Sequence, residues 1–195
     1  MQLDVTFPNL KKIREEIKKT EKETQGAVQK AIKDAANRAP AQVTKAVTAV
    51  YGIKSSEVTA AGGAAKRGKK TVGQIKVSGV TAETIQLTYS GRPLTLTHFG
   101  MTPKQRPEGN RKYTVKAAIL KGRRIGFEGA FVQTANNATL AFVREGKARY
   151  PIKAIKRTSI PQMIGNENVT ADIQQRIDDV LQDRIAHYTE RALQK

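Results

Sequence analysis

One stretch, residues 129–161, constrains the fold of this chain more than any other. Two apolar and aromatic runs, residues 130–133 and 140–144, flank a short polar insert with Asn136 and Asn137 at its centre. Asparagine tolerates positive φ, so this pair predicts the tip of a β-hairpin. Residues 150–152, Tyr-Pro-Ile, predict another extended segment, because a proline disfavours helix at the residue before it. We therefore expect an antiparallel sheet at this stretch, with the rest of the chain covering it.

Helical spacing of apolar residues occurs on both sides of that stretch. Residues 10–38 predict a first helix, and Pro40 fits the first position of a second helix over residues 41–51. The first helix would be about 43 Å long at about 1.5 Å per residue, so it either bends near Gly26 or projects into solvent. A polar turn between two shorter helices fits equally well. One apolar stripe over residues 169–193 predicts a long amphipathic C-terminal helix.

Between the helices the apolar period changes to two, which predicts strands near residues 75–78, 85–89, 94–97 and 113–117. The sequence therefore predicts an α+β fold, in which a small antiparallel sheet is flanked by a long N-terminal helix or helix pair and by the C-terminal amphipathic helix.

The expected division of the chain has four parts. They are an N-terminal helical segment (1–60), a flexible loop rich in glycine and lysine (61–73), an antiparallel sheet core (74–160) and a C-terminal helix packing on the sheet (161–195). The residues predicted to form the structural core are Phe131, Phe142, Tyr150, Pro151, Ile173, Ile177 and Leu181.

The chain is strongly basic, and the excess charge is unevenly placed. It has 35 Lys and Arg against 17 Asp and Glu, a formal net charge of +18, and residues 51–128 hold 15 cations against four carboxylates. Such a field attracts polyanions or acidic protein surfaces, although a solvated surface that only maintains solubility is the alternative. Three basic loops are the candidate contacts to DNA or to a partner protein, and would bind phosphate without base specificity: Lys66, Arg67, Lys69, Lys70, Arg106, Arg111, Lys112, Lys121, Arg123 and Arg124.

Other functional classes find little support in the sequence. There is no cysteine, and neither His98 nor His187 has a second ligand at helical or strand spacing, so no metal and no cofactor are expected. The phosphate-binding and nucleophile motifs of common enzymes do not occur, and Glu145 is the sole carboxylate within residues 129–161. We therefore expect no enzyme. No signal peptide or membrane helix is expected either, and synthesis should be cytoplasmic.

Several short motifs, in a fixed order, resemble a known family. They are Leu-Thr-Leu-Thr-His-Phe at 94–99, Gly-Ala-Phe-Val-Gln at 129–133, Phe-Val-Arg-Glu at 142–145, Tyr-Pro-Ile-Lys at 150–153 and Ser-Ile-Pro-Gln-Met at 159–163, followed by the amphipathic helix. This order resembles the minor tail protein Z family of phages and prophages, which are tail completion proteins of long-tailed phages. The resemblance covers about residues 10–193.

The resemblance implies a structural, non-enzymatic role in virion assembly. Such a protein would act at the head-proximal end of the tail, in the neck, where tail and filled head join and DNA is positioned. Its expected partners are the tail terminator, the tail tube and tape measure proteins, and further copies of itself, in a ring that could be hexameric. The alternative is a sequence-independent nucleic-acid-binding protein that is not part of a virion.

Overall fold

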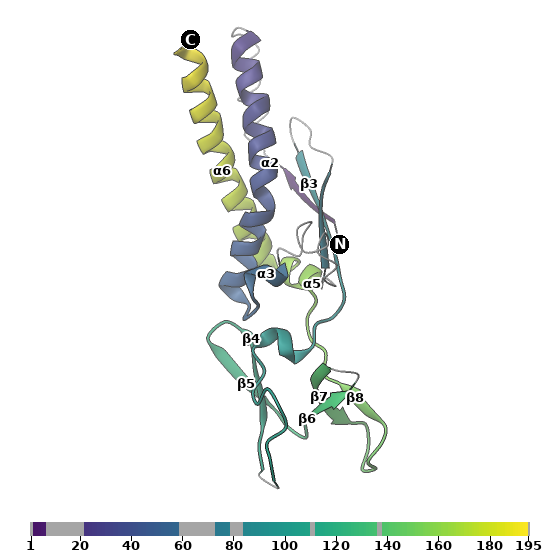
Figure 1. Ribbon diagram of the computed structural model, residues 1–195. Helices are drawn as coiled ribbons and strands as arrows, with labels where there is room; N and C mark the ends of the chain where they lie inside the picture. The colour runs from purple at the N-terminus through teal and green to yellow at the C-terminus, as the bar shows by residue number, and fades with distance from the viewer. Residues whose placement is uncertain are drawn as a thin grey trace.

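The computed structural model describes residues 2–6, 22–58, 73–78, 84–109, 112–135 and 138–194. Two long helices, α2 (Lys22–Val50) and α6 (Glu167–Leu193), run antiparallel side by side and form one end of an elongated molecule (Figure 1). One group of short strands lies beside α2, and two further groups lie at the opposite end of the molecule. The fold is mixed α+β with small antiparallel sheets, as the sequence predicted.

The strands of the described residues form three antiparallel groups. Beside α2 the order is β1–β3–β2, made of β1 (Gln2–Thr6), β2 (Gly73–Ser78) and β3 (Thr84–Gly91). The opposite end holds the hairpin of β4 (Val115–Leu120) and β5 (Arg123–Phe127), and the sheet of β6 (Phe131–Ala135), β7 (Ala138–Arg144) and β8 (Ile152–Ala154). We call these two groups, with their connecting loops, the lower body (residues 100–157).

The helix pair supplies much of the hydrophobic core. Alanines at positions 27, 31, 35 and 39 of α2 are buried at a spacing of four, which keeps them on one face. Val169, Ile173, Ile177 and Leu181 of α6 are buried at the same kind of spacing. Small side chains on one helix and branched ones on the other let the two helices pack closely. The ion pair of Arg184 with Asp34, at 3.8 Å, joins them at the edge of this contact.

α2 decides between the alternatives left open at Gly26 and corrects the expectation at Pro40. The helix is continuous through Gly26 and also through Pro40, where the sequence predicted a new helix. A proline inside a helix removes one backbone hydrogen bond and destabilises it by roughly 3 kcal/mol. The neighbours of Pro40 on the core face, Ala39 and Val43, are buried, so burial against α6 offsets that loss. The predicted helix start near residue 10 lies outside the described residues.

The C-terminal helix covers α2, although the sequence predicted that it would pack on the central sheet. The sheet β6–β7–β8 buries few side chains, among them Val132, Ala141 and Phe142, and has no apolar face long enough for a helix of this length. The short helix α5 (Ile160–Ile164) instead contacts a sheet, through β3. Its start is fixed by a capping box in which Ser159 and Gln162 bond each other's backbone N–H groups.

Residues 94–97 are not the strand that their alternation predicted. Leu96–Phe99 form a 3₁₀ helix, η1, and Gly100 follows it in the left-handed region with φ 61°. His98 Nδ1 lies 2.9 Å from Glu57 Oε2 of α3 (Ser55–Val58). Leu96 and Phe99 are both buried. Residues three positions apart lie on the same face of a 3₁₀ helix, so Leu96 and Phe99 both reach the core. The alternation of apolar and polar residues in the sequence predicted a strand and gave no sign of this helix.

The predicted hairpin is confirmed. β6 pairs with β7 in antiparallel register with Phe131 opposite Phe142, and β8 pairs with the other edge of β7. The tip at Asn136 and Asn137 lies outside the described residues. Tyr150 and Pro151 are not the core residues that the sequence predicted: both are exposed, Tyr150 by 60%.

Candidate cationic and aromatic site

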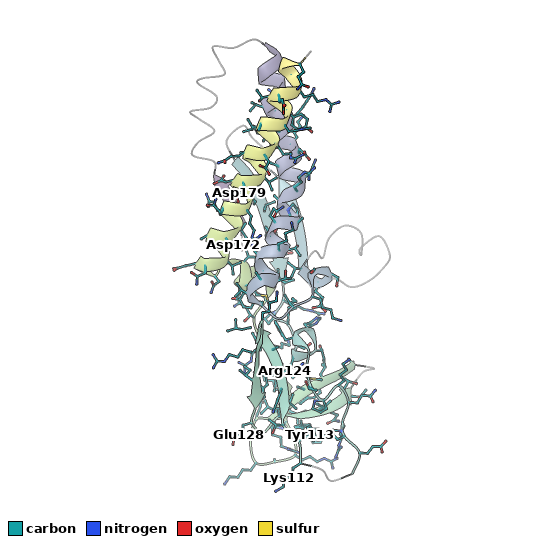
Figure 2. All side chains as sticks on the ribbon, turned by 90° about the vertical axis from the view of Figure 1, so that its left-hand side faces the viewer. Lys112, Tyr113, Arg124, Glu128, Asp172 and Asp179 are labelled. Carbon is teal, nitrogen blue, oxygen red and sulfur yellow. The ribbon has the colours of Figure 1, made fainter. Side chains whose placement is uncertain are left out.

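The two predicted basic loops that the structure describes, at least in part, do not gather in one place. Lys66–Lys70 and Arg111 lie outside the described residues. Lys121, Arg123 and Arg124 are exposed at the end of the β4–β5 hairpin that contacts α2, where the N–H of Lys121 donates to the Val50 carbonyl at 2.9 Å. Figure 2 shows Arg124 well separated from Lys112, which lies at the far end of the lower body. The sequence could not reveal this separation, because it depends on the direction of the hairpin.

Arg106 and Lys112, in contrast, meet at one pocket of about 470 Å³ in the lower body. Two cations that the sequence analysis did not single out, Arg144 and Arg149, line the same pocket. The lining that the structure describes contains no carboxylate. The ion pairs among the described residues involve other cations: Arg38, His98, Lys153, Arg176 and Arg184. Four cations at one pocket favour the binding of an anionic group there.

Aromatic side chains alternate with these cations along the pocket wall. The guanidinium carbon of Arg144 lies 4.8 Å from the centroid of the Phe131 ring, and that of Arg149 lies 5.8 Å from the Tyr150 centroid. Phe131 also stacks on Phe142, with centroids 6.2 Å apart and ring planes at 29°. A guanidinium that lies over a ring keeps its in-plane N–H groups free to bind an anion.

Two hydrogen bonds of the backbone position this wall. The N–H of Val132 on β6 donates to the hydroxyl oxygen of Tyr113 at 3.0 Å, which holds the segment before β4 against the edge of the sheet. The N–H of Glu145 donates to the carbonyl of Pro151 at 3.2 Å and closes the loop that carries Arg149 and Tyr150. The Glu145 carboxylate faces Lys153, at 3.8 Å, and does not line the pocket.

An adjoining hollow of about 640 Å³ shares Lys112, Tyr113, Phe131 and Arg144 with the pocket. Its lining includes Glu128, so its charge is mixed. Figure 2 shows Glu128 near Tyr113 at the same end of the molecule. The first pocket is therefore the stronger candidate for binding an anion.

Two other titratable groups, His98 and Asp178, are not among the residues that line this pocket. His98 pairs with Glu57, and within the described part of the chain no three His, Cys, Asp or Glu residues are grouped as a metal site would require. On α6, burial and then the neighbouring charge of Asp179 raise the pKa of Asp178. No described helix is long and apolar enough to span a membrane.

Five residues that line the pocket were not among the predicted contact residues: Arg144, Arg149, Phe131, Tyr113 and Tyr150. Arg144 is next to Glu145 and Arg149 follows Lys147 by two residues, so neither arginine belongs to a run of adjacent cations like those that marked the predicted loops. A weaker signal did exist: arginine follows an aromatic run at Arg144 and precedes an aromatic residue at Arg149. The convergence itself depends on strand register, which places the end of β7 beside the start of β6.

Comparison with known proteins identifies a family. The family model for prophage minor tail protein Z matches residues 4–195, nearly the whole chain. No curated protein and no solved structure matches the chain.

Proposed function

The chain belongs to the prophage minor tail protein Z family, and from that premise we propose that it completes the head-proximal end of a phage tail so that tail and head can join. The family assignment makes the chain a structural component of a phage tail. The neck position, the contact with DNA and a non-catalytic role are our proposals.

The observation that carries the proposal is the separation of charge along the molecule. Residues 92–157, which include the lower body, hold 15 Lys and Arg against three Asp and Glu, whereas α6 holds three cations against six carboxylates. Figure 2 shows Asp172 and Asp179 of α6 far from Lys112. A molecule with one strongly cationic end can direct that end toward DNA or an acidic tail surface and leave the helix pair for other protein contacts.

We further propose that the helix pair contacts neighbouring tail proteins or copies of this chain. The supporting feature is its shape: α2 and α6 extend together beyond the sheets (Figure 1). The tail terminator, tail tube and tape measure proteins are the expected partners, and a closed ring of copies is the expected assembly.

Deletion of the gene from a phage or inducible prophage tests the proposal. We expect filled heads and tails that fail to form infectious particles, counted by electron microscopy and by plaque titre, with recovery when the wild-type gene is supplied on a plasmid. A normal titre without the protein would refute the assignment to tail completion. Mass spectrometry of purified virions should detect the chain; its absence from virions, combined with tight DNA binding, would favour the non-virion nucleic-acid-binding alternative.

A further inference from the structure

We propose that the cationic and aromatic pocket of the lower body binds an unpaired nucleotide of single-stranded DNA, with phosphate on its arginines and the base on Tyr150. The inference rests on the proposed function, because it names the form of DNA that the head-proximal end of the tail would contact.

The size of the pocket favours an unpaired nucleotide over a base pair. A volume of 470 Å³ equals a cube about 8 Å on a side, which is narrower than the major groove alone of B-DNA, about 12 Å wide. The same volume falls within the range of roughly 300–1,000 Å³ that is typical of pockets for single small molecules. A duplex could touch the rim with its phosphates, but an unstacked nucleotide can enter.

The charge of the pocket favours phosphate. Arg106, Lys112 and Arg149 lie on loops around it, and Arg144 is the last residue of β7. The described lining residues offer no carboxylate that would compete for these cations. Arginine presents a planar set of N–H donors that matches two phosphate oxygens at once, so three arginines at one pocket suit a phosphodiester.

The aromatic residues supply a second requirement that a simple phosphate site would not have. Tyr150 is 60% exposed, so its ring is available to a ligand. Its loop is closed by the hydrogen bond between Glu145 and Pro151, and Arg149 lies near its ring. Stacking of a base on an exposed tyrosine is worth about 1–3 kcal/mol and does not depend on base identity.

An acidic peptide would also satisfy the cations, but it provides no flat group for the exposed ring unless it carries an aromatic residue of its own. A nucleotide brings phosphate and a flat base together in every repeat. The observations therefore favour single-stranded nucleic acid. Binding of an acidic peptide in its place is a result that the test below can detect.

Fluorescence anisotropy with the purified full-length chain provides that test. The probes are a labelled thymidine oligonucleotide, a labelled DNA hairpin without unpaired ends, and a polyglutamate competitor of equal charge. We expect Tyr150→Ala to weaken binding of the single strand by about 5- to 150-fold, the equivalent of about 1–3 kcal/mol of stacking, and to leave hairpin binding unchanged. Tyr150→Phe should bind the single strand as the wild type does, because it keeps the ring.

Charge variants separate the pocket from the general basic surface. Arg149→Gln should weaken single-strand binding and reduce the slope of log K against log salt by about one. Arg123→Gln is the matched control at the other end of the β4–β5 hairpin. It should reduce both the single-strand affinity and the salt slope by less than Arg149→Gln does. Circular dichroism establishes that each variant is folded, and Tyr150→Leu replaces Tyr150→Ala if that variant does not fold.

Three results would overturn the inference: equal single-strand binding by Tyr150→Ala and the wild type, equal loss of hairpin and single-strand binding, or competition by polyglutamate as effective as that by unlabelled oligonucleotide. None of these bears on whether the gene deletion blocks tail completion, so failure of this inference and failure of the proposed function are distinguishable.

Discussion

Phe142 on β7 lies directly opposite Phe131 on β6, with ring centroids 6.2 Å apart, yet only Phe142 is buried. The buried ring of Phe142 anchors the small sheet. The half-buried ring of Phe131 forms part of the pocket wall, and the guanidinium carbon of Arg144 lies over it, 4.8 Å from the ring centroid. One cross-strand pair thus connects the stability of the lower body to the shape of its candidate site.

The two rings should differ in what their removal does. We expect Phe142→Ala to lower the free energy of unfolding by about 3 kcal/mol, because it leaves a cavity, and Phe131→Ala by about 1 kcal/mol. Urea denaturation followed by circular dichroism measures both. Equal losses would mean that the two rings share the packing energy evenly, contrary to their burial.

The junction between α2 and the lower body depends on Gly52. Its N–H donates to the Ile119 carbonyl at 2.9 Å, and a Cβ at this position would overlap the carbonyl oxygen of Ala118. We expect Gly52→Ala to destabilise the fold by about 3 kcal/mol, because backbone must move to accept the methyl group. Gly146→Ala is the matched control, since a Cβ there meets nothing within 4 Å, and it should leave the melting temperature unchanged.

The sequence predicted the fold class, the C-terminal helix and the hairpin of residues 131–144, because each depends on a local period or turn. It failed at Pro40 and at residues 96–99, where contacts from distant elements decide the outcome. Burial against α6 maintains the helix through Pro40, and packing of Leu96 and Phe99 into the core accompanies the 3₁₀ turn.

The candidate site shows the same limit. Arg106 and Lys112 were predicted from a cation-rich loop, whereas Arg144 and Arg149 were not, because they are separated by other residues and follow an apolar strand pattern. Their convergence follows from the pairing of β6, β7 and β8, which is a property of three-dimensional register.

Replacement of Pro40 should stabilise α2. In Pro40→Ala the new N–H can donate to the carbonyl of Ala36, and we expect the free energy of unfolding to rise by about 1–3 kcal/mol. Gln42→Ala, two residues away in the same helix, is the control and should change it by less than about 0.5 kcal/mol. Urea denaturation measures both; a loss of stability in Pro40→Ala would show that packing against α6 requires the proline geometry.

Asp178 should make stability fall as pH rises. Burial, and then the charge of Asp179, raise its pKa in the folded state above the ordinary value of 3.8, so the folded protein binds its proton more tightly than the unfolded chain does. Its contribution is fully present below pH 3.8 and is lost as pH increases through the folded-state pKa. We therefore expect Asp178→Asn to be more stable than the wild type at pH 7 and no more stable at pH 3, by thermal denaturation. Asp183→Asn, on an exposed position of the same helix, should show a smaller dependence on pH.

We expect assembly of infectious particles to depend on where the cations of this chain lie, as well as on how many there are. We expect a plasmid that encodes Arg106→Glu together with Arg149→Glu to fail to restore plaque titre in the deletion strain, because both changes place carboxylates at the pocket. Lys121→Glu together with Arg123→Glu changes the net charge equally at the other end of the β4–β5 hairpin and should restore most of the titre. Immunoblots of infected cells check that both proteins accumulate. If both pairs fail alike, overall charge governs assembly; if both restore titre, the pocket makes no contact that assembly needs. Only a difference between the two pairs supports a role for the pocket itself, since the substitutions are matched in number, sign and exposure.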